Sequence, residues 1–189
     1  NDDVNCSQST NDAYPTAIKL GVILALKDTL GAMGELALAL DAKAAEFADV
    51  IKMGRTENQD AVPMTLGQEF GAYATMIRSA MRSLERAGEE LHYINMGATA
   101  IGTGINSPPG YADRVTEHLR EVSGLPVVKA DDLVEATQNA GGFVQMSANM
   151  KRSAVQVSKI CNDLRWLSSG PRCGLFEIRL PAMQPGSSI

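Results

Sequence analysis

The chain has 189 residues, of which 44% are hydrophobic and 21% charged, and its formal net charge is −5. This composition is apolar enough to build a core and too apolar for a disordered chain. The negative charge provides no basic field for a nucleic acid. No apolar run approaches the roughly 18 residues that span a bilayer, so the sequence also excludes a membrane protein.

A first long helix is expected over residues 15–51, after the capping candidates Asn11 and Asp12. Its apolar residues recur with helical spacing and extend over more than one side. The helix would be about 55 Å long, which exceeds the roughly 40 Å diameter of a compact globule of this size. We therefore expect either a break at Gly31 or Gly34, or an elongated molecule that shares its core with other chains. The lack of an interrupting proline favours the shared bundle.

Further helical segments follow. A second helix is expected over 66–94, apolar on one face and charged on the other. A short amphipathic helix follows the Pro-Pro-Gly at 108–110, and a third long helix is expected over 131–167, weakened by the glycines at 141–142. The only strand-like stretch is 125–128, and its proline makes it a poor strand. The expected fold class is all-α, a bundle of long antiparallel helices.

Polar loops separate these helices. Residues 7–12 lead into the first long helix, where hydroxyls, amides and free backbone N–H groups would form an anion pocket, although simple capping explains the same residues. The loop 52–60 holds Thr56 beside a cation and amides, or is a plain connector with Gly54 as helix cap. The glycine-serine run 185–189 suits either a lid or a linker.

Other motifs give no site of their own. The stretch NMGATAIGTGIN (95–106) lacks the Gly-Lys-Ser/Thr of a phosphate-binding loop and follows a helix, so we interpret it as a tight turn where backbones approach closely. His92 and His118 share no motif, and we predict no metal site. The three cysteines, an odd number without CxxC spacing, exclude a disulfide framework and indicate a reducing cytoplasm.

Five segments together closely resemble the aspartase/fumarase superfamily. They are SQSTNDAYPT (7–16), KMGRTENQDAVPMTLGQEF (52–70), NMGATAIGTGIN (95–106), SKICNDLRWLSSGPRCG (158–174) and PGSSI (185–189). The resemblance covers essentially the whole chain. It implies that residues 1–189 are the central helical domain of a longer enzyme, without its N-terminal domain, the rest of the catalytic loop and the C-terminal domain.

The resemblance also implies an activity. The expected reaction is the reversible anti β-elimination of ammonia from L-aspartate, giving fumarate, in a homotetramer where each site collects segments from three subunits. No cofactor is expected. Ser187 matches the family's catalytic serine and would act as general base, and Ser188 would contribute to the closed lid. A serine can do so only where a positive environment lowers its pKa strongly.

The remaining site residues are expected by the same matching. Ser9, Thr10 and Asn11 would hold one substrate carboxylate, and Thr56 would help to hold the substrate. Glu57 occupies the position where fumarases and many relatives carry histidine. Its carboxylate would repel a dianionic substrate but pair with the α-ammonium of aspartate, so we hypothesise that Glu57 favours an amino substrate.

Two alternatives remain open from the sequence. One is fumarate hydratase, with the same fold and base but malate as substrate, and the segments 165–166 and 171–174 are more fumarase-like. The other is a catalytically inactive helical oligomerisation fragment. The family's signature continues past GSSI with a lysine and an asparagine, so the chain by itself is expected to be inactive or nearly so.

Overall fold

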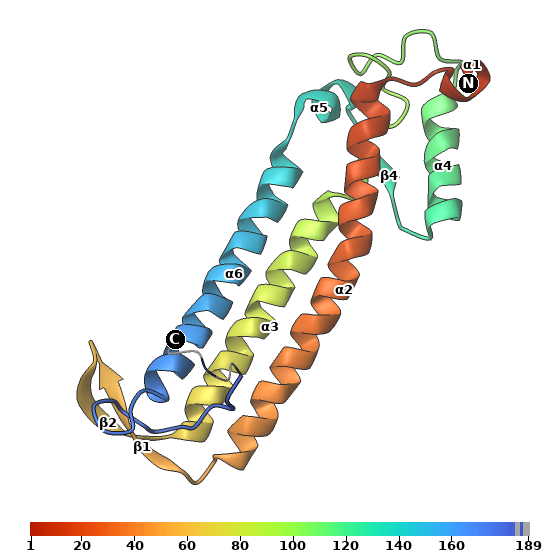
Figure 1. Cartoon of the computed structure of the whole chain (residues 1–189). Coiled ribbons are helices and arrows are strands. Elements are labelled where there is room, and N and C mark those ends of the chain that lie inside the picture. Colours follow the sequence, from red (N-terminus) through yellow and green to blue (C-terminus); the bar gives the residue numbers. More distant parts are fainter. Residues whose placement is uncertain (184–185, 187–189) are drawn as a thin grey trace. The chain divides into compact units, whose positions relative to one another are not determined.

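The computed structural model describes residues 1–183 and 186, and the chain divides into two compact units. Unit 1 comprises residues 1–33 and 80–150, and unit 2 comprises residues 34–79 and 151–189. Three long helices each contribute residues to both units, and within each unit their directions alternate along the chain (Figure 1). They are α2 (Thr10–Glu46), α3 (Leu66–Glu90) and α6 (Gly141–Leu167). The all-α prediction is confirmed.

Helix α2 is unbroken, with 37 residues and a length of about 55 Å. Neither Gly31 nor Gly34 interrupts it. It begins five residues earlier than predicted, so Pro15 lies inside the helix rather than in its first turn. It also ends at Glu46, before the predicted end at Ile51, because residues 47–50 turn the chain into a strand that begins at Ile51.

Unit 1 has two adjoining cores. Leu84, Leu91 and Met146 are buried where α3 and α6 meet apolar residues of α2. Ile94, Met96 and Val127 form the second core against the apolar face of α4 (Tyr111–Ser123), the short helix predicted after the Pro-Pro-Gly. The unit also holds α1 (Asp2–Asn5), α5 (Leu133–Gln138) and a two-residue parallel pair, β3 (Tyr93–Ile94) with β4 (Val128–Lys129).

Two helix boundaries in unit 1 follow from polar groups. The third long segment is split, as the glycines at 141–142 suggested, because α5 ends at Gln138 and α6 starts at Gly141. The Asn139 side chain accepts the backbone N–H of Gly141 at 2.7 Å, which satisfies one of the free donors at the start of α6. Helix α3 ends at Glu90, short of the predicted residue 94, because β3 follows.

Unit 2 contains a β-hairpin that the sequence did not predict. Strand β1 (Ile51–Thr56) pairs antiparallel with β2 (Gln59–Thr65), with an irregularity at Gly54. Gly54 therefore does not cap a helix, and the prediction of 125–128 as the only strand-like stretch is wrong. A Cβ on Gly54 would lie 2.8 Å from the Val62 carbonyl oxygen, so the close pairing of the strands requires glycine there.

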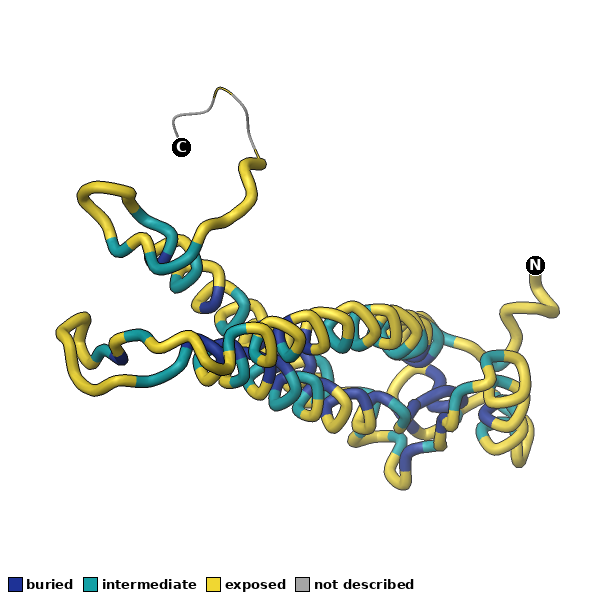
Figure 2. Tube along the Cα trace, turned by 90° about the horizontal axis from the view of Figure 1, so that it is seen from below, coloured by how far each residue is buried: buried dark blue, intermediate teal, exposed yellow. Residues whose placement is uncertain are grey.

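Apolar side chains of α2 remain exposed. Buried residues recur at intervals along the helices, and much of the rest of their surface is exposed (Figure 2). Leu24 and Leu38 of α2 are 54% and 67% exposed, which is a large apolar surface for one helix. Among the described residues, no helix has both the length and the apolar composition needed to cross a bilayer.

Candidate functional site

The predicted anion-binding residues lie at the N-terminus of α2 in unit 1. Ser9 precedes the helix and is half-buried, and Thr10 and Asn11 are exposed in its first turn. The Ser9 hydroxyl oxygen accepts the backbone N–H of Asn11 at 3.1 Å, and the Asn11 amide donates to the Ala100 carbonyl at 2.7 Å. The positive dipole end of α2 favours an anion at this point. The backbone N–H groups of Ser9, Asn11, Asp12 and Ala13 already have acceptors within the protein.

A buried carboxylate lies directly behind these residues. Asp12 is completely buried, and one of its oxygens accepts the backbone N–H groups of Ser9 and Ala13 at 2.8 Å each. The other oxygen accepts those of Gly97 and Thr99 at 3.1 and 3.0 Å. Sequence analysis identified Asp12 only as a capping candidate. The structure adds that it fixes the glycine-rich stretch 95–106 to the start of α2.

Thr56 and Glu57 lie at the tip of the hairpin in unit 2. Glu57 and Asn58 form its two-residue turn with φ of 48° and 65°, as a type I′ turn requires. Asparagine tolerates this left-handed backbone well, whereas glutamate adopts it rarely. Both Thr56 and Glu57 are exposed, so a strained backbone presents the Glu57 carboxylate to solvent.

A pocket of about 270 Å³ opens beside this turn, within unit 2. Glu57 and Asn58 line it, together with cations and anions in close alternation. The cations are Lys52, Arg55 and Lys159, and the anions are Glu69 and Asp163. Most of these charges are paired within the protein: Lys52 with Glu69, Arg55 with Glu177 and Lys159 with Asp163.

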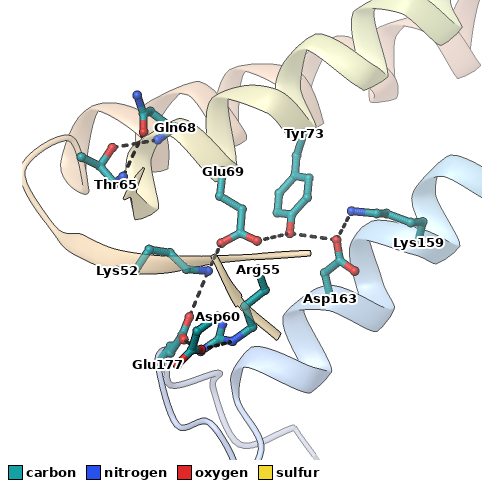
Figure 3. A network of polar contacts seen from close by, with 10 residues as sticks. All are labelled: Lys52, Arg55, Asp60, Thr65, Gln68, Glu69, Tyr73, Lys159, Asp163 and Glu177. Atoms are coloured by element: carbon teal, nitrogen blue, oxygen red, sulfur yellow. Dashed lines mark hydrogen bonds and ion pairs between the residues drawn. The ribbon is translucent and has the colours of Figure 1, made fainter. Parts of the chain in front are cut away.

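An ion-pair network links strand β1 of the hairpin to α3 and to Glu177 (Figure 3). Lys52 of β1 pairs with Glu69 of α3 and, at 2.9 Å, with Glu177. Arg55 also pairs with Glu177. Burial by itself raises the pKa of the Glu177 carboxyl, but hydrogen bonds from Arg55 and Lys52 and their charges bring that pKa below its ordinary value.

Tyr73 of α3 extends the network to α6. Its hydroxyl lies 3.2 Å from a Glu69 oxygen and 3.0 Å from an Asp163 oxygen, and Asp163 also pairs with Lys159 (Figure 3). Burial and the two carboxylates raise the pKa of Tyr73, so the tyrosine stays protonated and acts as a hydrogen-bond donor. Sequence analysis missed this network. One indication of it was present in the sequence, because Glu177 is the only Asp or Glu after Asp163 and so suggested a specific ion pair.

The structure does not bring all predicted site residues together in one unit. Ser9, Thr10 and Asn11 belong to unit 1, whereas Thr56 and Glu57 belong to unit 2. Ser187 and Ser188 lie outside the described residues. Within residues 1–183 and 186, no cluster of three or more His, Cys, Asp or Glu side chains is suited to hold a metal ion.

Comparison with known proteins gives consistent matches over the whole chain. Residues 1–189 match the family described as "Lyase". An aspartate ammonia-lyase of Pseudomonas aeruginosa is 57% identical over 190 residues, which is 100% of this chain and 40% of that protein. This chain therefore spans about 40% of the length of the curated relatives it matches.

Two solved structures match closely. A fumarate lyase of Brucella melitensis has a TM-score of 0.96 and 52% identity, covering 100% of this chain and 41% of that one. A class II fumarase of Schistosoma mansoni has a TM-score of 0.92 and 33% identity, covering 98% and 42%. The helical fold is thus shared with both, while the sequence is much closer to the ammonia-lyase than to the fumarase.

Proposed function

The chain belongs to this lyase family, the aspartase/fumarase superfamily, and from that premise we propose that the protein is an aspartate ammonia-lyase. It converts L-aspartate reversibly to fumarate and ammonium. The observation that carries the proposal is the 57% identity to an aspartate ammonia-lyase over the whole chain, against 33% to the class II fumarase.

The α2 N-terminus is proposed to bind one substrate carboxylate. Removal of a proton next to a carboxylate places additional negative charge on an anionic group, so donors aimed at that charge supply the largest contribution to catalysis. The exposed Thr10 hydroxyl and Asn11 amide, together with half-buried Ser9, lie at a helix end where the dipole adds to the effect. Ser187 as general base and Ser188 in the lid remain proposals from the resemblance.

Thr56 and Glu57 are proposed to hold the other part of the substrate. Glu57 presents an exposed carboxylate from a turn whose backbone disfavours glutamate. A carboxylate there pairs with the α-ammonium of aspartate, and malate has no such cation to offer. Glu57 therefore supports an amino rather than a hydroxy substrate.

Assembly as a homotetramer is part of the proposal. The two binding motifs lie in different units, and α2 carries exposed leucines that a partner chain would cover. In the family to which the motifs belong, each site collects segments from three subunits. The three cysteines are exposed and unpaired, which supports a reducing, cytoplasmic location.

The main competing function is fumarate hydratase, favoured by the close structural match to a class II fumarase. The full-length protein should be incubated with aspartate and with malate in parallel, while the ultraviolet absorbance of fumarate is followed. We expect fumarate to form rapidly from aspartate and ammonia to appear in equal amount. Faster conversion of malate would establish the hydratase, and no conversion of either would leave only a helical assembly module.

A further inference from the structure

The glycine-rich stretch 95–106 is a sequence motif that the proposed reaction does not use. The structure places it against the start of α2. The buried Asp12 carboxylate joins the two segments, because it accepts four backbone N–H groups. Two of these N–H groups belong to the α2 N-terminus, and the other two, those of Gly97 and Thr99, belong to the stretch itself. One side chain thereby fixes the distance between the two segments.

A second link arises from Pro15. Proline has no N–H, so in a helix the carbonyl four residues earlier loses its normal donor. Here that carbonyl belongs to Asn11, and the Asn95 side chain donates to it at 3.0 Å. Asn95 is completely buried and is oriented by a further bond to the Thr137 hydroxyl at 3.1 Å. The stretch thus replaces the hydrogen bond that Pro15 removes, at the residue proposed to bind substrate.

A third link sets the direction of the Asn11 side chain itself. An amide has two N–H donors, and one of those of Asn11 is held by the Ala100 carbonyl at 2.7 Å. This bond restricts the rotation of the amide and so limits the directions in which its second donor can point. Such preorganised donors bind an anion without first having to be ordered.

The stretch is supported from behind by α4. Gly97 has φ of +93°, and a Cβ there would lie 2.5 Å from the Ala112 side chain. The backbone of the stretch therefore rests directly on α4, in a conformation that suits only glycine. The sequence-based interpretation of close backbone approach is confirmed, and the contact leaves the stretch little room to move away from α2.

We propose that Asp12 and Asn95 are positioning residues for the carboxylate-binding segment Ser9–Asn11, and that the glycine-rich stretch serves as its rigid support. Neither residue touches the substrate. Asp12 fixes the backbone of the segment, and Asn95 completes the turn of α2 that carries Asn11. The inference rests on the proposed function, because it assumes that Ser9–Asn11 bind a substrate carboxylate.

The test uses Asn95→Leu, which removes the donor without adding charge, and Asp12→Asn, which keeps the shape of the side chain. Both are made in the full-length protein. We expect the KM for aspartate to rise and kcat to fall, so that kcat/KM drops about tenfold or more. The segment holds the carboxylate in the ground state and stabilises its added charge in the transition state, so both constants should change. Direct calorimetric binding of fumarate, which reports the ground state alone, should weaken by a smaller factor.

Two further variants separate positioning from general destabilisation. Thr116→Val deletes another buried hydroxyl of unit 1, which donates to its own helix at 2.8 Å, and should leave KM unchanged. Thr137→Val removes the bond that orients Asn95 and the bond from the same hydroxyl to the Leu133 carbonyl within α5. It leaves the buried Asn95 and Asp12 in place, so it should fold even if Asn95→Leu does not, and should raise KM by a smaller factor. Melting temperatures of all variants report the stability loss.

The outcomes are distinct. The inference is overturned if Asn95→Leu and Asp12→Asn fold and keep the wild-type KM. It is also overturned if Thr116→Val raises KM as much as the Asn95 and Thr137 variants do. If Asn95→Leu and Asp12→Asn do not fold, an unchanged KM in Thr137→Val overturns it. A wild-type protein that acts on neither aspartate nor malate refutes the proposed function instead, before any variant is compared.

Discussion

Glu57 combines an unfavourable backbone with an exposed carboxylate, and strain of this kind is retained where the side chain has a task. We predict that Glu57→Gln lowers kcat/KM for aspartate by about tenfold or more, since a charge-assisted hydrogen bond to the ammonium becomes a neutral one. Activity on malate, if measurable, should not fall. Ammonia release and fumarate formation from the two substrates provide the ratio. An unchanged ratio would remove Glu57 from the substrate site.

Glu177 gives a prediction about acid stability. Its pKa is below the ordinary value of 4.5 because Arg55 and Lys52 outweigh the effect of burial, so its ionised form stabilises the fold above pH 4.5. That contribution is lost as the pH falls through the lowered pKa. Glu177→Gln should cost about 2 kcal/mol at neutral pH, less than a fully buried pair because the groups keep some exposure.

The pH dependence of this cost is the sharper measurement. Denaturant unfolding of wild type and Glu177→Gln should differ at pH 7, and the difference should shrink from about pH 4.5 and vanish once the pH is below the lowered pKa. Glu46→Gln is the matched control, because its pair with Lys43 is about half exposed on both sides and should matter little at any pH. A difference between wild type and Glu177→Gln that persists unchanged into acid would contradict the assigned ion pair.

At the scale of elements, the β1–β2 hairpin shows where sequence reasoning failed and why. The three long helices could be predicted because their periodicity is local, as could the break at Gly141. The hairpin depends on pairing between residues 51–56 and 59–65, and Glu57-Asn58 lacks the Asn-Gly signal of a type I′ turn. The contacts of Asp12 with Gly97 and of Asn95 with Asn11 were likewise hidden, since each joins residues more than 80 positions apart.

In the same hairpin, Glu57 is expected to reduce stability in order to present its carboxylate to the substrate. Glu57→Asn should stabilise unit 2 by about 0.5–1 kcal/mol, because asparagine accepts the left-handed backbone that glutamate disfavours. Glu85→Asn, an exposed position inside α3, should instead destabilise slightly because asparagine is a weaker helix former. The melting temperatures of the Glu57→Asn and Glu85→Asn variants, compared with the wild type, measure both effects. Destabilisation by Glu57→Asn would show that the turn does not strain the glutamate.

For the whole molecule, the exposed leucines of α2 indicate surfaces that other chains cover. Leu38 is 67% exposed within one chain, so Leu38→Glu should scarcely affect a monomer. In a tetramer that buries this face, a charge there should dissociate the assembly and abolish activity. Val122→Glu on α4, 88% exposed, is the control. The molecular mass of each protein in solution shows whether the assembly has dissociated. A stable monomer of the wild type would contradict the tetramer proposal.

The central claim is that residues of unit 1 from one protomer meet residues of unit 2 from another. Asn11→Ala and Thr56→Val, each predicted to be inactive, should therefore be dissociated together and reassembled as mixed oligomers. With random assembly from equal amounts, about a quarter of the sites combine an intact Asn11 with an intact Thr56 from different subunits. We predict recovery of roughly that fraction of wild-type activity. A mixture no more active than either variant alone, beside an active wild type treated identically, would contradict the shared site.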